Sequence, residues 1–72
     1  MEKYKIIVED TNIKEEAEGM EQLKKVLEGF YEKSKTKEWE FKDVKVYNSE
    51  DEDISESQFI EEMVCEIMDN DN

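Results

Sequence analysis

Carboxylate side chains are concentrated in the last third of the chain, residues 48–72. This segment contains ten of the 22 Asp and Glu residues and no lysine, whereas residues 1–47 contain the other twelve and all ten lysines. By subtraction, the segment carries a formal charge of −10 and the rest of the chain only −2, out of −12 in total. Surfaces that only maintain solubility usually mix both signs, so a single-signed segment indicates a field that attracts a basic partner.

We predict that eight of these carboxylates form a partner-binding acidic surface. They are Glu50, Asp51, Glu52, Asp53, Glu61, Glu62, Glu66 and Asp69. A carboxylate at every fourth helical position gives one charge per about 6 Å, roughly half the density of phosphates along one DNA strand. Imitation of a nucleic acid therefore requires the acidic loop 50–53 beside the helix, or a second subunit.

The competing prediction is a protein-interaction or oligomerising accessory module whose charge only provides solubility. In that case apolar faces bind the partner, or form a homodimer, through Phe59, Met63, Ile67 and Met68. Binding through charge weakens steeply with ionic strength and binding through apolar contacts does not, so salt separates the two.

A third alternative is weak calcium binding by residues 51–62. Asp51, Asp53, Ser55, Ser57 and Glu62 match positions 1, 3, 5, 7 and 12 of an EF-hand loop. Position 6, however, is Glu56 where the sharp turn requires Gly, and a strand precedes the segment rather than a helix. We therefore predict no metal site and no cofactor.

Catalytic chemistry is not indicated by the residue types present. The chain has no His, which is the usual acid–base group near neutral pH. Cys65 has acidic neighbours and no base to activate it, and paired carboxylates are too abundant to mark any pair as catalytic. We predict that the protein is not an enzyme. A charge of −12 also argues against direct binding of nucleic acid or of anionic membranes.

The first 47 residues predict a strand, a helix and further strand. Residues 3–9 alternate as a strand, and apolar spacing predicts a helix from Asn12 to about Ser34, with Gly19 as an alternative start. Residues 38–47 are also expected to be strand, but the apolar parity changes between Phe41 and Val44. A bulge or a short hairpin near residues 42–43 explains the change, and the hairpin is favoured because it supplies a third strand.

The final helix is the clearest element. Ser55 and Gln58 match a capping box, so the helix is expected to begin at Ser55. Six apolar residues then recur with helical spacing: Phe59, Ile60, Met63, Val64, Ile67 and Met68. We predict one small α+β domain, residues 1–72, with the order β-α-β(β)-α and both helices on one face of a two- or three-stranded sheet.

In its length, its charge of −12 and its acidic loop 50–53 leading to Glu61, Glu62, Glu66 and Asp69, the chain resembles small acidic inhibitors made by phages and mobile elements. These include anti-CRISPR and anti-restriction proteins that occupy a nucleic-acid site on their target. The resemblance implies a cytoplasmic, non-enzymatic inhibitor or regulator that mimics DNA or RNA. Its partner is then a basic nucleic-acid-binding protein or nuclease. No apolar run exceeds three residues, so we expect no membrane segment.

Overall fold

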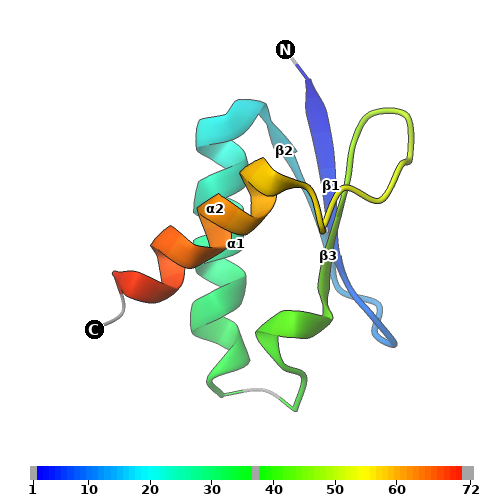
Figure 1. The fold of residues 1–72 in the computed structure, drawn as a ribbon. Coiled ribbons are helices and arrows are strands. Elements are labelled where there is room, and N and C mark those ends of the chain that lie inside the picture. Colours follow the sequence, from blue (N-terminus) through cyan, green and yellow to red (C-terminus); the bar gives the residue numbers. More distant parts are fainter. Residues whose placement is uncertain (1, 37, 71–72) are drawn as a thin grey trace.

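The computed structural model describes residues 2–36 and 38–70, and Asp71 and Asn72 of the acidic segment lie outside this range. Its elements are β1 (Lys3–Val8), β2 (Lys14–Glu18), α1 (Gly19–Ser34), the short 3-10 helix η1 (Phe41–Asp43), β3 (Val44–Tyr47) and α2 (Gln58–Asp69). The two α-helices lie on the same side of a three-stranded sheet (Figure 1). The predicted α+β class is thereby confirmed.

β1 is the central strand of the sheet, which has the order β2-β1-β3 with both pairings antiparallel. In this register Tyr4 lies opposite Ala17 and Ile6 opposite Val46. Period-2 alternation places Tyr4, Ile6 and Val8 on the buried face, with 6%, 0% and 1% of their surface exposed. The charged alternate residues Lys3 and Lys5 therefore face away from the helices.

Residues 14–18 form strand β2, and the prediction that they belong to the first helix was wrong. The chain turns back after β1, where the Val8 amide donates to the Ile13 carbonyl (3.2 Å) and the Thr11 hydroxyl to the Val8 carbonyl (2.8 Å). Pairing with β1 then satisfies the backbone of a segment whose Lys, Glu and Ala residues favour helix in isolation. Gly19 begins α1, as the alternative start predicted.

The prediction of a bulge or hairpin in residues 38–47 was also wrong, because a 3-10 turn produces the parity change. The Asp43 amide donates to the Glu40 carbonyl (2.9 Å), and the Glu40 amide donates to the Asp43 carboxylate (3.1 Å). Trp39 therefore precedes the strand and packs edge-on against Phe30, with ring centroids 6.1 Å apart. The third strand comes from β2 instead.

The core lies between the sheet and the two helices. α1 contributes Leu23, Leu27 and Phe30, while α2 contributes a second set, Ile60, Met63 and Ile67. Each set follows the helical spacing seen in the sequence, so the buried faces of both helices were predictable.

α2 begins at Gln58, three residues later than predicted. The hydroxyl of Ser55 accepts a hydrogen bond from the Val46 amide (2.8 Å), so Ser55 ties the preceding segment to β3 instead of capping the helix. Ser57 occupies the N-cap position, and its hydroxyl donates to the Ile54 carbonyl (2.6 Å). Contact with the sheet therefore takes precedence over the local capping signal.

Candidate functional site

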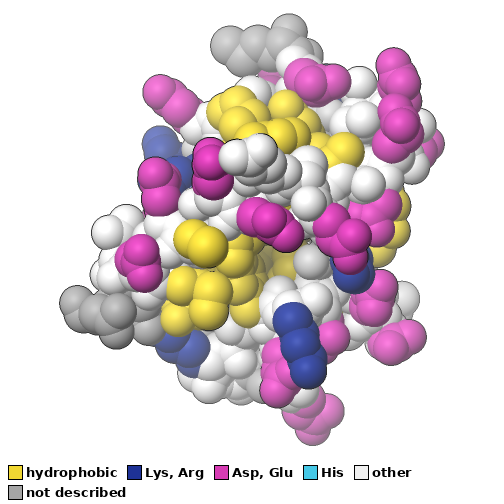
Figure 2. Space-filling model, viewed as in Figure 1, with side chains coloured by type: hydrophobic (Ala, Val, Ile, Leu, Met, Phe, Trp, Pro, Cys, Tyr) yellow, Lys and Arg dark blue, Asp and Glu magenta, His cyan; other side chains and the backbone are white. Residues whose placement is uncertain are grey.

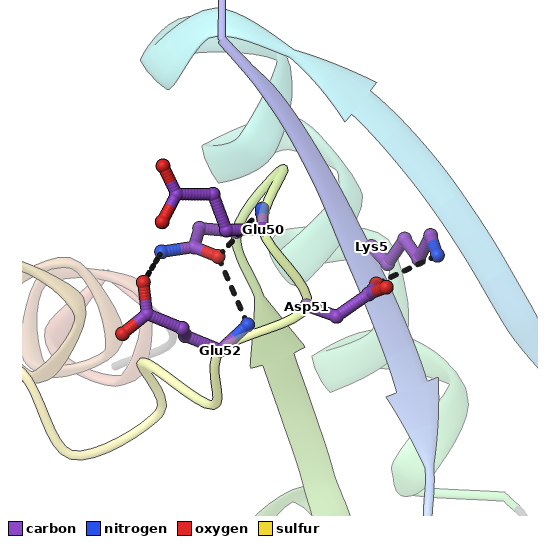
Figure 3. A network of polar contacts seen from close by, with 5 residues as sticks. Lys5, Glu50, Asp51 and Glu52 are labelled. Atoms are coloured by element: carbon purple, nitrogen blue, oxygen red, sulfur yellow. Dashed lines mark hydrogen bonds and ion pairs between the residues drawn. The ribbon is translucent and has the colours of Figure 1, made fainter.

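The acidic loop between β3 and α2 is closed by Asn48. The side-chain carbonyl of Asn48 accepts hydrogen bonds from the amides of Glu50 (2.9 Å) and Glu52 (3.0 Å). The Asn48 amide also donates to the Glu52 carbonyl (3.0 Å). These bonds hold three consecutive acidic residues in one compact turn (Figure 3). Asn at this position is a common way to organise a turn.

The carboxylates of this loop do not all point the same way. Asp51 forms an ion pair of 2.8 Å with Lys5 of β1, on the sheet face that the helices leave open, whereas Glu50 and Glu52 extend to the other side of the loop (Figure 3). Hydrogen bonding and charge from Asp51 raise the pKa of Lys5. Asp51 has a φ of 63°, an uncommon conformation that Asp tolerates better than most residues.

Asp53 connects the loop to the segment before α2. Its carboxylate accepts a hydrogen bond from the Ser55 amide (2.9 Å), and its backbone bridges to Tyr47 at the end of β3. Hydrogen bonding by the Ser55 side chain, followed by that amide, lowers the pKa of Asp53 below its ordinary value of 3.8. Asp53 is thus part of the local structure as well as of the acidic surface.

Four of the predicted site residues lie on α2. Glu66 forms an ion pair of 3.0 Å with Lys24 of α1, and the Gln58 side chain donates to Glu62 (3.3 Å). Glu62 and Asp69 are exposed on the side away from the core, while Glu61 borders a groove on another side of the helix. Helical spacing therefore places Glu62, Glu66 and Asp69 on one side of α2, as the sequence indicated, with Glu61 apart from them.

Most of the predicted acidic surface has no neutralising cation. Within residues 2–36 and 38–70, lysine ion pairs reach only Asp51 and Glu66 of the eight predicted residues. The other six have no lysine nitrogen of the described residues within 4.0 Å: Glu50, Glu52, Asp53, Glu61, Glu62 and Asp69. Apart from Asp53, whose carboxylate is hydrogen-bonded to Ser55 and attracted by Lys45, these residues direct their charge into solvent or toward a partner.

The alternative apolar surface is smaller than the sequence suggested. Met63 and Ile67 are core residues, with 8% and 4% of their surface exposed, so they are not available to a partner in the folded protein. Phe59 and Met68 are exposed by 37% and 47%. The prediction that Met63 and Ile67 contact a partner was therefore wrong, because both belong to the core.

A groove lies between β3 and α2, and the sequence did not predict it. It has a volume of about 520 Å³, with Phe41, Val44 and Val46 on one wall and Val64, Cys65 and Met68 on the other. Figure 2 shows hydrophobic side chains gathered around a hollow below α2, with acidic side chains along its upper border. The groove is formed by elements that are far apart in the sequence. Its local sequence feature is the apolar face of α2, which is wider than the part of the helix that packs in the core.

The described residues contain no group of three or more His, Cys, Asp or Glu side chains placed to hold a metal ion. The EF-hand-like pattern is divided between separate structures, because Asp51 binds Lys5, the Ser57 hydroxyl donates to the Ile54 carbonyl and Glu62 lies within α2. Cys65 is exposed and unpaired.

Comparison of the chain with protein-family models, curated proteins and solved structures found no match. Neither α1, with 16 residues, nor α2, with 12, is long and apolar enough to cross a membrane.

Proposed function

We propose that the protein is a non-enzymatic inhibitor or regulator that acts in the cytoplasm. Its acidic surface binds a basic protein whose normal ligand is a nucleic acid. The observation that supports this proposal is the set of six acidic residues in loop 50–53 and α2 that have no lysine within ion-pair distance in the part of the chain that the structure describes. Such a surface attracts a basic protein over long range and competes for a site built to receive phosphates.

The spacing of the carboxylates on α2 partly supports the proposal that this surface occupies a phosphate-binding site. On α2, Glu62 and Asp69 are seven residues, or about 10.5 Å, apart along the helix axis, and Glu66 between them is paired with Lys24. One DNA strand carries a phosphate about every 3.4 Å along the duplex axis, so α2 supplies an incomplete imitation and the acidic loop adds charge to it. This is the kind of interaction used by the phage and mobile-element inhibitors that the chain resembles.

A pull-down with a matched control tests the proposal. The bait protein is compared with a triple variant of unpaired α2 acids, Glu61→Gln, Glu62→Gln and Asp69→Asn, in a low-GC bacterial lysate eluted by steps of salt. The control variant changes three acids of the first 47 residues, Glu15→Gln, Glu21→Gln and Glu28→Gln. Both variants lose the same number of charges, so they differ only in where the charge is lost.

We expect the native bait and the control variant to retain a nucleic-acid-binding protein that leaves at moderate salt, and the α2 variant to lose it. Purified partner should then be displaced from the bait by added DNA or RNA. Equal retention by all three baits, or equal loss from both variants, contradicts a specific acidic surface.

The second candidate is an accessory module that binds through apolar surface. The groove between β3 and α2, together with the exposed Phe59 and Met68, favours it. Capture that persists in high salt and is unaffected by the α2 variant supports this candidate.

A further inference from the structure

We propose that the groove between β3 and α2 receives an amphipathic helix of the partner, with an apolar row in the groove and a cationic row against α2. This inference rests on the proposed function, because it specifies how a basic partner is held. The groove provides a binding site with a defined shape, whereas the acidic surface alone provides only electrostatic attraction.

The groove is of a suitable size and composition. Its volume of about 520 Å³ lies within the range of protein pockets that hold a ligand, here several large aliphatic side chains. Phe41 and Val44 on one wall and Val64 and Met68 on the other present apolar surface. Binding of apolar side chains here removes that surface from water, which is the usual basis of helix-in-groove recognition.

The backbone beside the groove favours a helical occupant over an extended one. β3 is an edge strand, but most of its outward-facing backbone amide and carbonyl groups already have hydrogen-bond partners. The Val44 amide donates to the Phe41 carbonyl, the Val46 amide to the Ser55 hydroxyl (2.8 Å), and the Val46 carbonyl accepts from the Ile54 amide (2.9 Å). An added strand needs free partners along such an edge. A helix satisfies its own backbone and needs only side-chain contacts.

Charge around the groove indicates where the partner's cations lie. The lysines on the β3 side already have acidic partners, since Lys42 pairs with Glu40 (3.0 Å) and Lys45 with Glu9 (4.0 Å). On the α2 side, Glu56 and Glu61 border the groove and have no lysine within 4.0 Å in the described part of the chain. Lysine or arginine on the α2 flank of the occupant therefore finds unneutralised carboxylates.

A second copy of this chain is a poorer occupant than a basic partner. Its α2 helix carries no cation and would bring further carboxylates toward Glu56 and Glu61. Like charges at close range oppose that arrangement.

The test uses a fluorescent synthetic peptide of about 18 residues, roughly five helical turns, with leucines in one row and lysines along one flank of that row. A second peptide has the same composition in an order that scatters the leucines around the helix. Binding to the native protein is followed by fluorescence anisotropy. We expect the amphipathic peptide to bind at least tenfold more tightly than the scattered one.

Paired variants then locate the site. Met68 and Met20 are exposed by similar fractions, 47% and 44%, but only Met68 borders the groove. Glu61 of α2 and Glu21 of α1 are both exposed, and only Glu61 borders the groove. Met68→Ser and Glu61→Gln should each weaken binding about fivefold or more, whereas Met20→Ser and Glu21→Gln should change it less than twofold. Circular dichroism confirms that each variant is folded.

The outcomes separate this inference from the proposed function. Equal binding of both peptides, or equal effects within both variant pairs, overturns the proposal that the groove receives a helix. In that case, charge-dependent capture in the pull-down still supports the proposed inhibitor function. Groove binding without such capture supports the groove and contradicts the inhibitor. Absence of peptide binding overturns the groove. A dimer in light scattering that dissociates in Met68→Ser also overturns it, in favour of a second copy as the occupant.

Discussion

Individual polar residues in the loop between β3 and α2 hold like charges close together. The Asn48 side chain accepts hydrogen bonds from two backbone amides there, and Lys5 forms an ion pair with Asp51. Exposed ion pairs of this kind contribute about 0–1 kcal/mol to stability. The hydrogen bonds to Asn48 therefore provide much of the stabilisation of the turn. The loop therefore presents its remaining carboxylates from a defined backbone.

Asp53 gives this loop a pH dependence. Hydrogen bonding with Ser55 lowers the pKa of Asp53 in the folded chain, so the carboxylate contributes stability that is present above the unfolded value near 3.8 and is lost as pH falls through the lower folded value. We expect the stability difference between the native chain and Asp53→Asn to favour the native chain at pH 7 and to shrink as pH falls from about 4.5 to 3. Urea unfolding followed by the fluorescence of Trp39 measures it.

The control for this pH dependence is Glu50→Gln, which removes a charge from the same loop. No described residue donates a hydrogen bond to the Glu50 carboxylate. A difference for Asp53→Asn that is constant with pH, or equal to that of Glu50→Gln, contradicts the role of Ser55.

Among the elements, the junction between β2 and α1 depends on its glycine. Gly19 has a φ of 79°, a conformation that costs other residues about 1–2 kcal/mol, and its amide donates to the Glu2 carbonyl (2.9 Å) beside β1. This conformation lets a strand pass directly into a helix with no intervening loop. Gly29 lies in the middle of α1, where a Cβ atom would meet nothing within 4 Å.

The same substitution should therefore have opposite effects at the two glycines. Gly19→Ala should lower the free energy of unfolding by about 1–2 kcal/mol, because alanine disfavours positive φ. Gly29→Ala should raise it by roughly 0.5–1 kcal/mol, because it reduces the entropy of the unfolded chain without a clash. Urea unfolding of both variants measures the two changes, and effects of the same sign would contradict the assigned conformations.

The molecule as a whole carries far more negative than positive charge. Among the described residues there are six lysine–carboxylate ion pairs, and none involves a buried residue. Such pairs are weak, whereas the excess of twelve negative charges repels across a molecule with a Cα radius of gyration of only 11.3 Å. Repulsion should therefore exceed the gain from ion pairs in the folded state.

Added salt should stabilise the protein for this reason. Raising NaCl from about 0.05 M to 0.5 M shortens the screening length from more than 10 Å to about 4 Å and weakens the repulsion. We expect the Tm to rise by about 5 °C, which corresponds to about 1 kcal/mol for a domain of this size. Thermal unfolding by circular dichroism measures the change. A fall in Tm would indicate that the ion pairs contribute more than the repulsion removes.

Apolar periodicity in the sequence was sufficient to predict the α+β class, strand β1 and the buried faces of both helices. Each of these follows from residues within a few positions of one another, such as Ile60, Met63 and Ile67 on α2. The acids of α2 likewise fall on its exposed side because helical spacing is local. Their role in binding a partner stays a prediction.

Long-range contacts determined what local patterns did not. Residues 14–18 favour helix by composition, but their backbone pairs with β1, and Ser55 binds β3 instead of capping α2. The groove is the clearest case, since its walls come from η1, β3 and α2 and exist only once these elements pack. Strand pairing and groove formation join residues distant in sequence, whereas propensity and periodicity report only on neighbours.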